Sequence, residues 1–253
     1  MTPRPDSTDL ERAIKFRHVF NVRDLGGLST ADGRAVRRGQ VFRADGVNRL
    51  ADEDLDVARA MGLRTVIDLR TLGEVEGRTQ FPVEALSVRW HHLPVLQGMW
   101  SEQELVATAG AVDFLRDRYL DMLIEGRESI VRAVELVADE APVLFHCAAG
   151  KDRTGVVAAV VLGLLEVPPE AIADDYHLSA GAMAAFVDWL TLEFPEALDS
   201  MTSQPPEYLE APAEAMLGFL SEIDRRHGSM EAMAMSLGLT DDVIERLRSS
   251  LLV

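Results

Sequence analysis

The stretch from residue 142 to residue 165 constrains the fold of this chain more than any other. An apolar run, 142–145, precedes a short polar loop, and a second apolar run, 156–165, follows it. This order predicts a buried strand, a tight loop and a buried helix. The loop therefore lies between the carboxyl end of a strand and the amino end of a helix, where unpaired N–H groups and the helix dipole favour an anion.

The residues of this loop carry chemistry that suits an anion. Lys151 and Arg153 fall in the first turn of the helix, where a positive charge is unfavourable unless an anion lies between it and the helix end. Cys147, the only cysteine in 253 residues, stands at the mouth of the loop. The field that favours an anion should also stabilise the thiolate of Cys147.

These residue types fit transfer of a phosphoryl group. A thiolate can attack phosphorus in line and form a phosphocysteine that water then hydrolyses. Arg153 can fork onto two phosphate oxygens and follow them through the transition state. Ala148 and Ala149 lack bulk, so backbone amides can approach the ligand, and Gly150 permits the positive φ that such a loop requires.

Three more loop residues have expected roles. Thr154 is expected to donate its hydroxyl to the thiolate, and His146 to brace the loop by a hydrogen bond to backbone. Lys151 adds a positive charge close to the phosphate. Taken singly, a lone cysteine is usually a small core residue and a Lys-Asp-Arg triplet a solvated helix face. Their order between two apolar runs favours function.

The string from His146 to Gly155 resembles the HCxAGKDRTG form of the Cys-x5-Arg loop in cysteine-dependent phosphatases, and most closely the bacterial atypical tyrosine phosphatases. The resemblance extends over nearly the whole chain, through the segments 21–27, 41–45, 68–70 with Glu74, and 174–176. It implies a phosphatase acting on phosphotyrosine, and also on phosphoserine, phosphothreonine or phosphoinositides. The mechanism requires no metal and no cofactor.

The leaving group needs a proton from a nearby acid. Many cysteine phosphatases place an aspartate on a separate loop after a strand, but the comparable stretch 91–97 has no carboxylate. Asp152, inside the cysteine loop, is the predicted acid. The alternative is that Asp152 only stabilises the helix dipole. Asp45, Glu102 and Glu104 are the next candidates.

Other polar residues are expected to support the loop. Asp68 and Arg70 end a predicted strand and should face the loop, because ligands gather at the carboxyl ends of parallel strands. Arg70 is expected to bond loop carbonyls or substrate, with Asp68 orienting it; the alternative is an Arg70–Glu74 ion pair. Asp24 and Asp45 are predicted to support the loop rather than to catalyse.

Composition and net charge restrict the classes of molecule that this chain can be expected to bind. The 25 basic and 42 acidic residues give a formal net charge of −17, which argues against nucleic acid and against stable membrane association. A phosphorylated protein or phosphoinositide must find a local positive pocket. A single cysteine excludes an intramolecular disulfide, and residues 1–10 have no apolar signal core, so a cytoplasmic location is expected. No oligomeric state is predicted.

Strands separated by helices predict an α/β fold with a mainly parallel central sheet flanked by helices. We expect one phosphatase domain over residues 1–253, with an N-terminal segment (1–20), a reduced lid (95–126) and a helical C-terminal part (205–253) packed on it. The pattern predicts a turn at Asp32-Gly33, strands near 40–43, 63–69, 87–93 and 141–145, and helices over 52–61 and 128–138.

Two helix starts are also predicted. Ser101 and Glu104 form a capping box for a helix towards Glu125, and Thr240 should cap the last helix. Just before that capping box, Met99 and Trp100 either line a substrate pocket or anchor the helix to the core.

Two other functions also use a loop of this kind. A phospho-ligand binding module would keep the cradle without turnover, but it has no need of a thiol. A sulfurtransferase also uses a loop cysteine, but the His-Cys-x5-Arg-Thr pattern suits a tetrahedral phosphate better. The phosphatase is the leading hypothesis.

Overall fold

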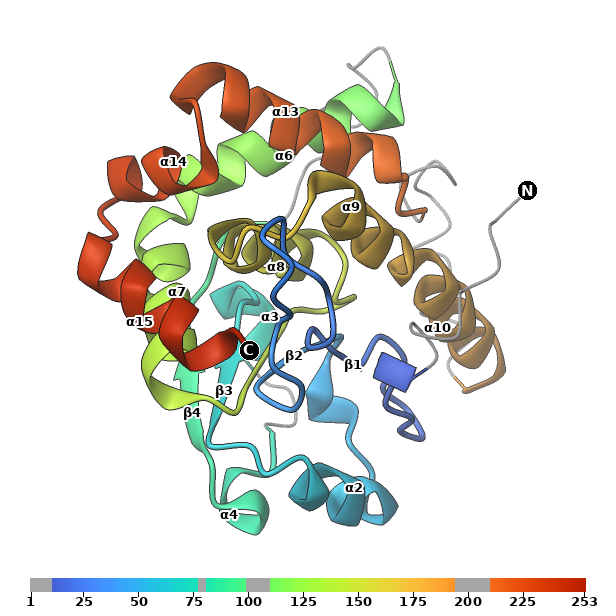
Figure 1. Cartoon of the computed structure of the whole chain (residues 1–253). Coiled ribbons are helices and arrows are strands. Elements are labelled where there is room, and N and C mark those ends of the chain that lie inside the picture. The colour runs from blue at the N-terminus through green and yellow to red at the C-terminus, as the bar shows by residue number, and fades with distance from the viewer. Residues whose placement is uncertain (1–10, 77–80, 99–109, 194–209) are drawn as a thin grey trace.

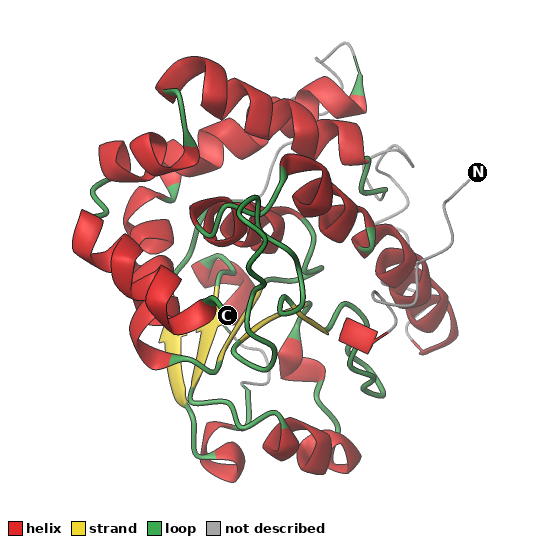
Figure 2. Cartoon of the chain, in the orientation of Figure 1, coloured by secondary structure: helices red, strands yellow, loops and turns green. Residues whose placement is uncertain are grey.

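The computed structural model describes residues 11–76, 81–98, 110–193 and 210–253. Helices surround a small sheet in this part of the chain (Figure 2). The fold is therefore the mixed α/β class predicted from the alternation of strands and helices.

The sheet has the strand order β1-β2-β5-β3-β4. Only β1 is antiparallel to its neighbour; β2, β5, β3 and β4 are parallel to one another. Its strands are β1 (Arg23–Asp24), β2 (Val41–Ala44), β3 (Thr65–Asp68), β4 (Arg89–His92) and β5 (Val143–His146). The last four confirm the predicted strands, and β5 lies at the centre of the sheet.

Helices of very different length connect and cover the strands. The short helices are η1 (Val47–Arg49), η2 (Asp52–Asp54), α2 (Leu55–Ala60), α3 (Leu72–Val75) and α4 (Val83–Leu86). The longer helices are α6 (Ala111–Glu125), α7 (Arg127–Glu140), α8 (Asp152–Leu164), α9 (Pro169–His177), α10 (Ser179–Glu193), α13 (Ala213–His227), α14 (Met230–Leu237) and α15 (Asp241–Leu251). In Figure 1, α13 runs along α6 and α15 lies against α7, so the C-terminal helices pack on the earlier ones.

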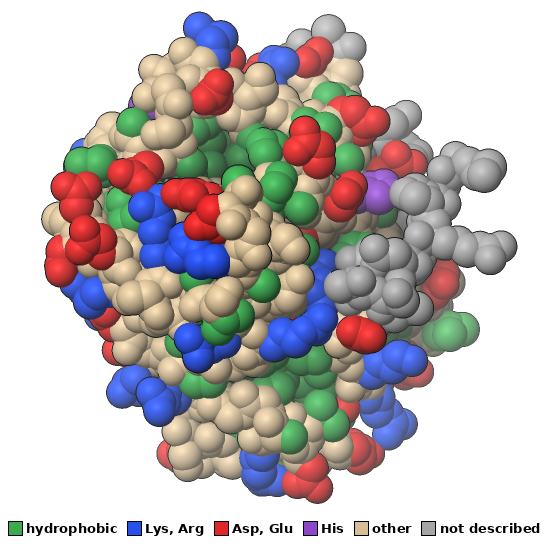
Figure 3. Space-filling model, in the orientation of Figure 1, with side chains coloured by type: hydrophobic (Ala, Val, Ile, Leu, Met, Phe, Trp, Pro, Cys, Tyr) green, Lys and Arg blue, Asp and Glu red, His purple; other side chains and the backbone are tan. Residues whose placement is uncertain are grey.

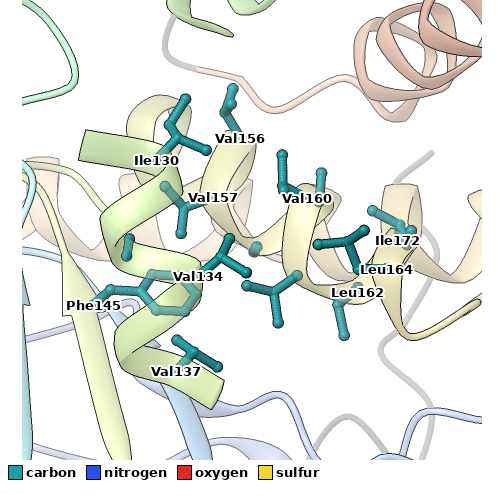
Figure 4. Close-up of a cluster of buried hydrophobic side chains, with 14 of the residues drawn as sticks. Ile130, Val134, Val137, Phe145, Val156, Val157, Val160, Leu162, Leu164 and Ile172 are labelled. Atoms are coloured by element: carbon teal, nitrogen blue, oxygen red, sulfur yellow. The ribbon is translucent and has the colours of Figure 1, made fainter. Parts of the chain in front are cut away.

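The central strands β2, β3 and β5 are buried on both faces, whereas the edge strand β4 is partly exposed. On one face, side chains such as Phe145 pack with α7 and α8, as the close-up in Figure 4 shows. On the other face, Phe42, Val66 and Leu144 form a second cluster with Met61 and residues of α4 and the N-terminal segment. Because successive side chains point to opposite faces, the central strands β2, β3 and β5, covered on both faces, are buried at every position.

Several local predictions can be compared with the structure. The turns at Gly33 and Gly62 have positive φ values of 86° and 63°, as a hairpin turn and a helix end require. The Thr240 prediction is partly wrong: it occupies the N-cap position, but its side chain makes no capping hydrogen bond. Its carbonyl instead accepts hydrogen bonds from the backbone N–H groups of Val243 and Ile244.

The predicted lid segment, residues 95–126, lies partly inside and partly outside the described ranges. Residues 111–125 form α6, which buries six side chains in the core, among them Tyr119. The Ser101–Glu104 capping box, Met99 and Trp100 lie outside the described residues. The lid and the role of those four residues stay predictions.

The face of the molecule in Figure 3 shows acidic and basic side chains intermixed rather than separated by sign. The strongly negative net charge therefore does not make this face uniformly acidic. No helix in the described ranges is long and apolar enough to cross a membrane.

Candidate active site

The cysteine loop connects β5 to α8 at the carboxyl edge of the sheet. His146, the last residue of β5, is level with Ala44 of β2 and Asp68 of β3. Gly150 has φ 66°, as predicted, and a Cβ there would come within 2.6 Å of the Ala44 carbonyl oxygen. Both the conformation and the close approach to β2 therefore require glycine at this position.

Cys147 and Arg153 lie together beneath the surface. The Cys147 side chain is 2% exposed, and Arg153 is the second residue of α8. Burial alone would lower the pKa of Arg153, but the charges of Cys147 and Glu74 outweigh burial and raise it. Arg153 is therefore a permanent cation beside the thiol.

Glu74 holds the end of the Arg153 guanidinium. Its two carboxylate oxygens accept hydrogen bonds from Nη1 at 2.5 Å and Nη2 at 3.0 Å. Glu74 is fixed in turn by the start of α3, where it accepts a hydrogen bond from the Thr71 backbone N–H. This contact uses the two terminal nitrogens and leaves the Nε–H edge of Arg153 for an anion.

Asp152 begins α8 and is tied to two buried tyrosines. The Tyr119 hydroxyl donates to Asp152 Oδ1 at 2.6 Å and is 2.6 Å from the Tyr176 hydroxyl. These rings come from α6 and α9. One carboxylate oxygen of Asp152 is thus anchored, while its side chain keeps 21% exposure.

The other loop side chains only partly match expectation. Lys151 Nζ donates to the Glu210 carbonyl oxygen at 2.9 Å and lies 3.4 Å from Asp152 Oδ1, so its charge is shared with protein acceptors. The Thr154 hydroxyl is buried and has no hydrogen-bond partner among the described residues. The expected Thr154–thiolate hydrogen bond is therefore absent here.

His146 contacts backbone, as predicted. Its Nδ1 is 3.3 Å from the Cys147 carbonyl oxygen, and its Nε2 is 3.6 Å from Asp68 Oδ2. Burial lowers the pKa of His146 to about 4, and Asp68 offsets this only in part. The ring is therefore neutral at physiological pH.

Asp68 orients Arg70, but the alternative pairing is wrong. Both oxygens of Asp68 accept hydrogen bonds from Arg70, the shortest at 2.7 Å to Nη2. Arg70 Nη1 donates to Asn48 Oδ1 at 3.1 Å. Glu74 pairs with Arg153 rather than with Arg70, because Asp68 and Arg153 provide closer, buried partners.

The carboxylates of Asp24 and Asp45 both accept hydrogen bonds from backbone N–H groups. Asp24 accepts hydrogen bonds from the N–H groups of Gly26 and Gly39, each at 2.8 Å. Asp45 accepts from the N–H groups of Phe20 and Asn21 and pairs with Arg49. Burial raises the pKa of Asp45, although Arg49 and the backbone donors oppose this effect.

The structure also brings residues to the loop that the sequence reasoning missed. Asn21 Nδ2 donates to the carbonyl oxygens of Ala149 and Gly150, and Arg43 Nη2 donates to that of Gly150. One signal was present: Arg43 lies inside a strand that is otherwise apolar and buried. Such a charge requires a buried partner.

That partner is Asp175, on α9. Its carboxylate is within 3.1 Å of nitrogens of Arg12, Arg23 and Arg43, and all four side chains are almost fully buried. Burial alone would raise the pKa of Asp175, but the three arginines outweigh it and hold the pKa far below its ordinary value. Burial and the neighbouring Arg43 lower the pKa of Arg23 to about 10.

Histidines near the sheet edge make other contacts. His92 Nε2 is 2.8 Å from the Arg70 carbonyl oxygen, and His91 Nε2 is 3.9 Å from Glu140. The described residues contain no group of three or more His, Cys, Asp or Glu side chains arranged to hold a metal ion.

Comparison with known proteins agrees with this geometry. The model of the tyrosine phosphatase family matches residues 14–253. A protein of Cupriavidus necator whose name places it among the tyrosine-protein phosphatases is 32% identical over 193 residues, which is 73% of this chain and 69% of that protein. The triple specificity protein phosphatase PtpB of Mycobacterium tuberculosis is 26% identical over 92% of this chain and 97% of its own length.

Two solved structures have a lower similarity. The Siw14 catalytic core is 17% identical, with a TM-score of 0.37 over 64% of this chain and 85% of that one. P. aeruginosa TpbA is 16% identical, with a TM-score of 0.30 over 57% of this chain and 71% of that one. Because the family model spans almost all of the described chain, including the cysteine loop, this chain belongs to the tyrosine phosphatase family.

Proposed function

We propose that this tyrosine phosphatase works through Cys147, Arg153 and Asp152 as nucleophile, phosphate clamp and general acid. The observation that carries the proposal is the placement of a buried cysteine at the end of β5, directly before a helix whose second residue is a buried arginine. Helix N–H groups and Arg153 favour a phosphate dianion at that point.

In the first step the Cys147 sulfur forms a bond to phosphorus as the bond to the leaving oxygen breaks. The leaving oxygen takes a proton from Asp152. In the second step water forms a bond to phosphorus, the S–P bond breaks, and the carboxylate takes a proton from that water. Phosphate leaves and both side chains regain their starting forms.

The geometry favours Asp152 over Asp45 as the acid. Asp45 is 3% exposed and uses both carboxylate oxygens for backbone N–H groups. Asp152 is more exposed, and its second oxygen accepts no hydrogen bond from a described residue. The remaining candidates, Glu102 and Glu104, lie outside the described residues.

We further propose that the substrates include phosphotyrosine and extend to phosphoserine, phosphothreonine or phosphoinositides. The name of the PtpB relative, which calls it a triple specificity phosphatase, supports this breadth. We also propose that Lys151 adds positive charge near the phosphate. Its ammonium group contacts the Glu210 carbonyl oxygen and Asp152 as well.

Phosphate release from an aryl phosphate, with a metal chelator present, tests the reaction class. Turnover is expected with chelator, whereas a binding module would give none. A thiosulfate assay tests for sulfur transfer and should be negative. A panel of phosphotyrosine peptides, phosphoserine peptides and short-chain phosphoinositides, compared by kcat/KM, then tests substrate breadth; activity on phosphotyrosine peptides alone would reject the wider range.

A further inference from the structure

Three successive carbonyl groups of the cysteine loop are bound from outside the loop. The Ala148 oxygen accepts a hydrogen bond from the Gly46 N–H at 3.0 Å. The oxygens of Ala149 and Gly150 each accept one from Asn21 Nδ2 at 3.0 Å. The Gly150 oxygen accepts a second, from Arg43 Nη2, at 2.8 Å.

These contacts also fix the direction of the N–H groups. In a planar trans peptide the N–H of the next residue points opposite to the carbonyl oxygen. Anchoring the carbonyls of residues 148–150 therefore turns the N–H groups of residues 149–151 to the other side of the loop. Among the described residues, the N–H groups of Ala149 and Gly150 have no acceptor, which suits donors meant for an anion.

Asn21 is itself held in one orientation. Its Oδ1 accepts a hydrogen bond from Arg23 Nη1, so its Nδ2 must face the loop. Its backbone N–H donates to Asp45 Oδ1 at 2.9 Å. The side-chain amide is thus fixed at both its acceptor end and its backbone.

Asp175, on α9, is the shared acidic partner of Arg23 and Arg43. Arg23 and Arg43 are directly opposite in the β1–β2 register, an unfavourable pairing for like charges. Asp175 accepts hydrogen bonds from both, and the Ser179 hydroxyl lies within 3.4 Å of both. The pair can be buried because a carboxylate lies between them.

We propose that Asn21 and Arg43 are positioning residues for the phosphatase reaction. They hold the Ala149 and Gly150 carbonyls outward, so that the N–H groups of the loop are set towards the phosphate before it binds. The inference rests on the function proposed for Cys147 and adds residues that act on the substrate only through the loop backbone. Without them the loop can rotate a carbonyl towards the anion, which weakens binding and stabilises the thiolate less.

Asn21→Ala tests this without changing any charge. The readout is alkylation by iodoacetamide, followed against pH and against inorganic phosphate, because Cys147 is the only cysteine in the chain. Removing donors of this kind should weaken phosphate protection by about 10–100-fold and move the alkylation profile to higher pH. Unchanged phosphate protection and an unchanged pH profile in folded Asn21→Ala would overturn the inference.

Asp54→Ala is the matched control. Asp54 is also buried and accepts hydrogen bonds from the backbone N–H groups of Arg17 and Ala51, neither of which belongs to the cysteine loop. Thermal unfolding reports the stability loss of both variants. The inference requires that Asp54→Ala keep phosphate protection; an equal loss in both variants would show a general effect of destabilisation and reject it.

Arg43→Lys gives a second measurement should Asn21→Ala not fold. An ammonium keeps the charge but cannot hold Asp175 and the Gly150 carbonyl with a fixed fork. Phosphate protection should fall by about 10-fold, and wild-type protection would reject the role of Arg43. Failure of the proposed function is seen separately, as absence of phosphatase turnover in the wild-type protein.

Discussion

The two sides of the cysteine loop are built in different ways. The anion side takes its groups from one short stretch, Cys147 to Arg153. The supporting side takes its groups from Asn21 and Arg43, which are 107 to 129 residues away from the carbonyls they hold. Chemistry is therefore encoded locally in this chain, whereas the geometry of the same loop is encoded by distant residues.

Two buried arginines show the same contrast. Arg153 gives its two terminal nitrogens to Glu74, which leaves its Nε–H edge for an anion. Arg43 divides its nitrogens between Asp175 and the Gly150 carbonyl. One guanidinium is arranged for a ligand, and the other for the backbone.

The largest expected effect is on the anion side. Cys147→Ser should lower kcat for an aryl phosphate by at least about 10⁴-fold, because a hydroxyl is a far poorer nucleophile at neutral pH. Phosphate binding, measured by calorimetry, should persist because the N–H donors and Arg153 remain. Substantial turnover in Cys147→Ser would remove the covalent mechanism.

Arg153→Lys should lower kcat/KM by about 10²–10³-fold, since an ammonium cannot fork onto two phosphate oxygens. Glu74→Gln is the companion variant, because it keeps the shape and one acceptor while leaving Arg153 in place. Steady-state kinetics should show a smaller loss for Glu74→Gln. Equal losses would assign the effect to the ion pair rather than to a contact of Arg153 with phosphate.

Asp152→Asn should slow substrates according to their leaving group. Alkyl leaving groups need the proton and should lose about 10²–10⁴-fold, whereas aryl groups of low pKa should lose much less. Tyr119→Phe removes the hydroxyl that bonds Asp152 and Tyr176 but keeps the carboxyl group, and should give a smaller loss with the same trend. A uniform loss across leaving groups would show that Asp152 shapes the loop and that the acid lies elsewhere.

The sequence predicted the strand, loop and helix that carry Cys147 because their signals are local. Apolar runs and the turn glycine act within a few residues of where they occur. It left Asp68 and Glu74 as alternative partners of Arg70 and did not connect Glu74 with Arg153, because these side chains meet only in the folded chain. It missed Asn21 as a support because the carbonyls that it binds acquire their direction only in the folded loop.

The smallest effect concerns His146, the last residue of β5, directly before Cys147. Its folded pKa, about 4, is below the ordinary value of 6.5, so the unfolded chain binds this proton first as pH falls. The stability that depends on neutral His146 is present above about pH 6.5 and is lost as pH falls towards 4. At about 1.4 kcal/mol per unit, this loss reaches about 3 kcal/mol.

Urea unfolding at several pH values between 4 and 7 measures this loss. His146→Gln should be less stable at pH 7 but should show a flatter decline, because the ring that titrates has been removed. Carboxylates whose pKa is lowered in the fold, such as Glu74, affect stability mainly below their ordinary value of 4.5 and so act outside most of this window. An equally steep decline in His146→Gln would show that another group causes the loss, and that His146 braces the loop without controlling its response to acid.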